Sequence, residues 1–216
     1  MAFAPALRIF TLTTHVTSSV GWAGAVLVFV ALAAIGLRSE DERTVRGAYL
    51  VMAPAAWFVL VPLAHASLFS GIALSLGTPW GLIRHYWVAL KLVITSFSTV
   101  ILLIYMGTFR QMAGVAADPV AELGLVRNPS PLLHAILALM LLFVATVLAI
   151  YKPFGMTPYG TRQMRARLGT QGLASTVQAT AAGQPRRWEY VLWIAGLAIL
   201  ALIILSHLLR SGAHAH

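Results

Sequence analysis

Five long apolar stretches alternate with shorter polar segments along the chain. They cover residues 6–37, 47–76, 86–109, 132–151 and 188–209. The hydrocarbon core of a bilayer is about 30 Å thick, so a helix needs roughly 20 apolar residues to cross it. The pattern therefore predicts an all-α integral membrane bundle of five transmembrane helices, which forms a single domain over residues 1–216.

Several polar residues and prolines indicate where these helices begin or bend. Residues 39–42 fit a capping box that starts at Ser39, so the second helix is expected to begin before its membrane portion. Pro54 and Pro62 lie inside this helix and are expected to bend it. Ser130 is expected to cap the fourth helix, with Pro131 at its first position.

Composition supports a membrane protein and narrows its chemistry. Hydrophobic residues make up 59% of the chain and charged residues 10%, whereas soluble domains carry about 25% charged residues. The absence of cysteine excludes disulfides, thiolate zinc sites and c-type haem attachment. The net charge of +9 comes mostly from loop residues, so membrane topology and anionic lipid explain it better than nucleic acid.

The connection between the fourth and fifth stretches, residues 152–187, predicts the orientation. It contains no acid, and its basic residues are Lys152, Arg162, Arg165, Arg167, Arg186 and Arg187. Loops rich in Lys and Arg stay in the cytoplasm. We therefore expect a basic cytoplasmic loop, irregular in part over residues 155–185, a cytoplasmic N-terminus, an external C-terminus and a multi-pass location in a bacterial inner membrane.

Histidines are the main candidate functional residues. The chain has seven histidines and six acids, and five of the histidines lie in or at the ends of the apolar stretches. An ionisable residue within a membrane span is a candidate for function, and histidine ligates haem, copper and zinc. Their positions sort into a cytoplasmic-side group, His15, His65 and His85, and an external pair, His134 and His207.

Two histidines on facing helices of a bundle can bind one haem iron from both sides. We predict that His15 and His65 ligate one haem, with His85 as a substitute for either, and that His134 and His207 ligate a second. The anionic propionates need nearby cations, and the candidates for that role are Arg84, Lys91, Arg127 and Arg210. The sequence thus predicts a membrane b-type cytochrome with one or two haem b groups and a quinone or redox protein as partner.

Two other interpretations use the same histidines. One is a copper-handling membrane protein, although copper(I) favours Cys and Met ligands and the chain has no Cys. The other is a cofactor-free scaffold or assembly partner whose histidines only form hydrogen bonds between helices. The sequence leaves open whether the chain is an enzyme.

Two segments carry a resemblance. Residues 14–22, THVTSSVGW, and residues 76–87, LGTPWGLIRHYW, resemble an uncharacterised family of small bacterial multispanning membrane proteins. That resemblance implies a membrane bundle and no particular activity. The layout of the histidines is similar to that of diheme transmembrane b-type cytochromes, with one haem in each leaflet.

Overall fold

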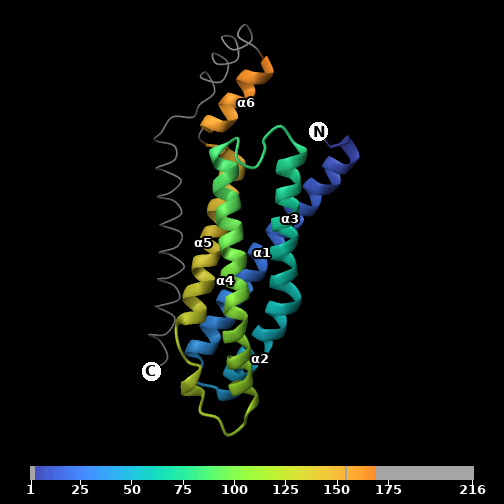
Figure 1. Ribbon diagram of the computed structural model, residues 1–216. Helices are drawn as coiled ribbons and strands as arrows, with labels where there is room; N and C mark the ends of the chain where they lie inside the picture. Colours follow the sequence, from blue (N-terminus) through green and yellow to red (C-terminus); the bar gives the residue numbers. More distant parts are fainter. Residues whose placement is uncertain (1–2, 154, 169–216) are drawn as a thin grey trace.

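The computed structural model of the protein describes residues 3–153 and 155–168 (Figure 1). Its elements are α1 (Pro5–Arg38), α2 (Glu42–Ala55), the π-helical segment η1 (Ala56–Leu60), α3 (Val61–Gly77), α4 (Tyr86–Ala117), the 3-10 turn η2 (Leu123–Leu125), α5 (Ser130–Tyr151) and α6 (Pro158–Leu168). Within the described ranges the chain is helical and contains no β-strand.

Four helical rods are long and apolar enough to cross a membrane. They cover Pro5–Arg38, Glu42–Gly77, Tyr86–Ala117 and Ser130–Tyr151. These rods support a multispanning helical bundle, and each of the first four predicted spans falls within one of them. The fifth predicted span, residues 188–209, lies outside the described residues.

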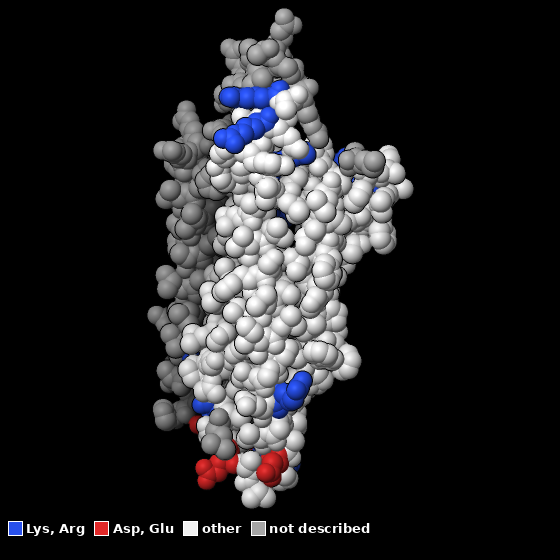
Figure 2. All heavy atoms as spheres, in the orientation of Figure 1, with Lys and Arg blue, Asp and Glu red and all other residues white. Residues whose placement is uncertain are grey.

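The packing of the rods sets the frame of the molecule. α1 and α4 each pack against α2, α3 and α5, and the rods lie side by side along one long axis (Figure 1). Acidic side chains gather at one end of this axis (Figure 2). We call this the acid-bearing end, formed by the turn at residues 39–41 and the connection at residues 118–129. The basic end, formed by residues 78–85 and α6, lies opposite.

The start of α2 corrects one sequence expectation. Ser39 does not cap this helix: its N–H closes α1 by donating to Ile35 O at 2.9 Å, and its hydroxyl faces Asp41 O at 3.5 Å. Asp41 is the cap, and its carboxylate accepts from the backbone N–H groups of Arg43 and Thr44. Hydrogen bonds from Thr44 hold the pKa of the Asp41 carboxyl below its usual value. The helix does begin ahead of the apolar stretch, as predicted.

The start of α5 corrects a second expectation. Ser130 is the first helical residue, and its hydroxyl lies 2.8 Å from Tyr105 Oη on α4 instead of capping its own helix. Asn128 closes the turn ahead of the helix, because its side-chain oxygen accepts the Ser130 N–H at 3.0 Å. Pro131 remains within the first turn, where a missing N–H costs little.

The two prolines of the second rod flank an irregular turn. Between Pro54 and Pro62 the backbone widens into η1, and the N–H of Val61 bonds to the carbonyl of Ala56, five residues earlier. Proline offers no N–H, so the regular ladder of hydrogen bonds is interrupted here. Helices often bend at prolines and at π-helical turns.

Residues 155–168 are more ordered than expected. The sequence predicted partly irregular chain here, but Pro158–Leu168 forms α6, and the Thr157 hydroxyl caps it by accepting the Gly160 N–H at 3.1 Å. The Thr157 N–H also donates to Arg84 O at 2.8 Å. A side chain at position 160 would place its Cβ 2.4 Å from Arg84 O, so glycine permits this close approach.

The densest core lies toward the acid-bearing end. Trp22, Val45, Tyr49 and Met52 are fully buried, and the rings of Phe29 and Phe109 meet edge to face at 5.4 Å. The outer surfaces of the rods are apolar instead, with Phe58 74% exposed. Such surfaces suit contact with lipid.

One buried hydroxyl gives a prediction about stability. Tyr49 is 1% exposed, and its hydroxyl has no hydrogen-bond partner among the described residues, whereas the Tyr105 hydroxyl is bonded to Ser130. Tyr49→Phe should therefore leave the free energy of unfolding unchanged or raise it by about 1 kcal/mol, while Tyr105→Phe should lower it by about 1 kcal/mol. Thermal unfolding of both variants in detergent checks this, and the opposite order would show that Tyr49 has a partner.

Candidate functional site

His15 is held in one orientation by α3. Its Nδ1 lies 3.0 Å from Ser67 O and 3.2 Å from Ser70 Oγ. A carbonyl oxygen can only accept, so in the neutral ring Nδ1 carries the proton and Nε2 has the free lone pair. Small residues admit the ring, since a Cβ on Gly71 would lie 2.9 Å from His15 Cε1.

The half-buried ring of His15 forms part of the wall of a cavity. This cavity has a volume of about 750 Å³ and is lined by residues of α1, α3, α4 and α5. Its wall is mainly apolar, with Leu12, Leu68, Ile72 and Leu92 among the lining residues. Cavities of this size and character are typical of sites for small molecules and cofactors.

All the charged side chains in the described cavity wall are positive. Arg8, Lys91 and Lys152 line it. Lys91 is half-buried, and its ammonium has no ion-pair or hydrogen-bond partner among the described residues. The acids of the described chain are Glu40, Asp41, Glu42, Asp118 and Glu122, all near the opposite end. The cavity is therefore suited to a ligand with an apolar body and negative charge.

Two tryptophans form part of the cavity wall near the basic end. Trp80 and Trp87 line it, and their rings meet at 5.5 Å. Lys152, which ends α5 in a left-handed conformation, places Nζ 5.1 Å from the centre of the Trp80 ring. Such a contact between a cation and an aromatic face is favourable. These lining residues, together with Arg8, were not identified as site residues from the sequence.

The other predicted residues of this half lie outside the cavity wall. His65 Nδ1 bonds to Val61 O of its own helix at 2.8 Å. At about 100° per residue, His65 lies roughly 120° to 160° around α3 from Gly71 and Ser67, which face His15. His85 Nδ1 bonds to Trp80 O at 2.8 Å, and the Arg84 guanidinium donates to Pro79 O at 3.2 Å. The pairing of His15 with His65 or His85 remains a prediction.

The predicted external site is only partly described. His134 is exposed, its Nδ1 lies 2.8 Å from Ser130 O, and its ring lies 4.5 Å from the Tyr105 ring. Nε of Arg127 is buried and has no hydrogen-bond partner among the described residues. His207 and Arg210 lie outside the described residues, so a second haem remains a prediction.

These features define a multi-pass α-helical membrane protein with a cation-lined cavity near its basic end. The chain matches no protein-family model, no curated protein and no solved structure. The resemblance to an uncharacterised bacterial membrane family and the likeness to diheme cytochromes therefore remain predictions from the sequence.

Proposed function

We propose that the protein is a membrane b-type cytochrome that binds haem b in the cavity, with His15 Nε2 as an axial ligand. The observation that carries the proposal is the Nδ1 hydrogen bond to Ser67 O, which leaves Nε2 free in the wall of the cavity. Histidines that ligate metals almost always donate their other ring N–H to a carbonyl or carboxylate. The bound haem would supply one-electron redox chemistry.

The chain's own residues meet the other needs of a haem. Apolar lining residues would cover the ring, and Arg8 and Lys152 would offer positive charge to the propionates. The described cavity wall contains one imidazole and no methionine, a donor set that suits haem iron better than copper(I). The outer haem on His134 and His207, with Arg127 and Arg210 near its propionates, belongs to the same proposal.

The proposed orientation places the basic end in the cytoplasm of a bacterium. The connection over residues 152–187 carries this argument, because it contains Lys152, Arg162, Arg165, Arg167, Arg186 and Arg187 and no acid. The cavity would then lie in the cytoplasmic half of the inner membrane. Electrons would pass between a quinone or a redox protein and the haem.

The test is the absorption spectrum of the purified protein. Protein extracted in mild detergent from cells that make ample haem should show a Soret band that shifts and sharpens on reduction with dithionite. Haem assay should give one or two haems per chain. A colourless protein that stays colourless after incubation with haemin would overturn the proposal; bound copper in that sample would favour the copper-handling alternative.

A further inference from the structure

The bundle places α1 and α4 on opposite walls of the cavity. Both helices pack against α3 and α5, so in the half of the bundle that holds the cavity α3 and α5 lie between them. His15 on α1 and Lys91 on α4 both line the cavity. Lys91 shares its side of α4 with other lining residues at helical spacing, Trp87, Val88 and Thr95, so this side of α4 faces the cavity.

Lys91 and His15 also lie at similar heights. His15 packs against Gly71, which is six residues before the end of α3, so about 9 Å along the helix axis. Lys91 is five residues after the start of α4, about 7.5 Å along its axis. The loop at residues 78–85 joins these two helix ends (Figure 1). His65, in contrast, is twelve residues before the end of α3, about 18 Å along the axis.

We propose, building on the proposed function, that Lys91 Nζ is the second axial ligand of the haem held by His15. A ring bound between α1 and α4 has one nitrogen donor on each side at a common height. The Lys91 ammonium loses one proton to water, and the neutral amine forms the bond to iron through its lone pair. Ligation also removes the cost of an unpaired ammonium in an apolar wall.

The experiment compares the spin state of the haem in full-length variants. Lys91→Leu removes the amine, and Lys91→Arg keeps the positive charge but cannot ligate iron. In both variants the cavity haem should change from low-spin to high-spin in absorption and electron paramagnetic resonance spectra, and it should bind carbon monoxide rapidly when reduced. His65→Ala is the matched histidine control and should keep the low-spin spectrum. Circular dichroism confirms that each variant is folded.

The outcomes separate this inference from the function on which it rests. A low-spin spectrum in Lys91→Arg but not in Lys91→Leu would mean that Lys91 binds a propionate instead of iron, and would overturn the inference. High-spin haem in His65→Ala, with both Lys91 variants unchanged, would also overturn it and support the His15–His65 pair. In both cases the haem is retained and the proposed function stands; the function fails only if the wild-type protein binds no haem.

Discussion

Replacing His15 by alanine is expected to remove the haem of the cavity. The substitution deletes Nε2, the one imidazole donor in the described cavity wall, and opens the space now filled between α1 and Gly71. Structural changes should be small, because the ring is only half-buried and its hydrogen bonds are to Ser67 and Ser70. Haem assay per chain, alongside circular dichroism, measures the effect.

Two comparisons make this result specific. Imidazole added together with haemin to His15→Ala should enter the space left by the ring and restore haem binding with a low-spin spectrum. His85→Ala is the matched variant, since His85 is at the same end of the molecule but is not in the cavity wall, and bonds to Trp80 O. Full haem content with an unchanged spectrum in His15→Ala would rule out His15 as a ligand.

The sequence predicted the spans well because hydropathy reports directly on the bilayer. It was less accurate at helix ends, where the cause is packing. The third span was predicted to end at residue 109, yet α4 continues to Ala117, with Met112 and Ala116 buried in the core next to α2. Side chains also have competing partners: Asp41 caps α2 in place of Ser39, and the Ser130 hydroxyl bonds to Tyr105 while Asn128 accepts the Ser130 N–H.

The candidate site was predictable in part. Counting residues along each helix predicted that His15 and His65 lie in one half of the membrane, yet His65 is about 9 Å farther from the end of α3 than Gly71, which His15 contacts. The direction in which each side chain points depends on how the helices face one another, and this information comes from packing. Lys91 was therefore predicted to contact a propionate, whereas its position on the wall opposite His15 emerged only from the arrangement of the bundle.

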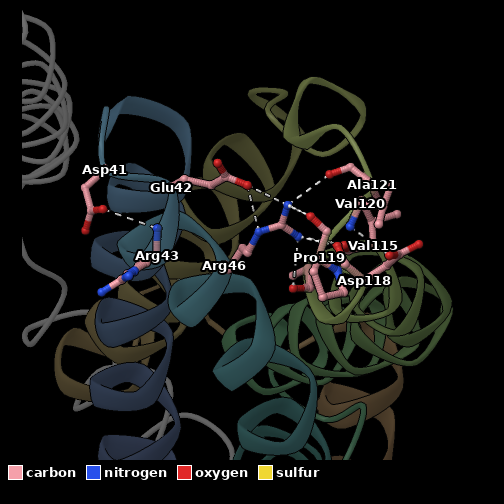
Figure 3. A network of polar contacts seen from close by, with 10 residues as sticks. Asp41, Glu42, Arg43, Arg46, Val115, Asp118, Pro119, Val120 and Ala121 are labelled. Carbon is pink, nitrogen blue, oxygen red and sulfur yellow. Dashed lines mark hydrogen bonds and ion pairs between the residues drawn. The ribbon is translucent and has the colours of Figure 1, made fainter.

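Arg46 organises the acid-bearing end. Its guanidinium bonds to the Glu42 carboxylate at 2.6 Å and reaches across from α2 to the end of α4 (Figure 3). There it donates to backbone carbonyls of Val115, Ala116, Asp118, Pro119 and Ala121. The last carbonyls of a helix have no partner within it and carry partial negative charge, so a fork of donors both satisfies them and complements the helix dipole.

Arg46→Met is therefore expected to lower the free energy of unfolding by about 2 kcal/mol, because several carbonyls lose a charged donor at once. The Arg46 side chain is 15% exposed, so water replaces it poorly. The melting temperature in detergent should fall by roughly 5 °C.

Glu42→Gln should cost only about 0.5 kcal/mol, since the Glu42 side chain is 62% exposed and the ion pair is screened. Arg46→Lys should recover little of the lost stability, because one ammonium cannot contact both the carbonyls at the end of α4 and those of the connection that follows it. Equal melting temperatures for Arg46→Met and Glu42→Gln would show that the ion pair, and not the carbonyl contacts, stabilises this end.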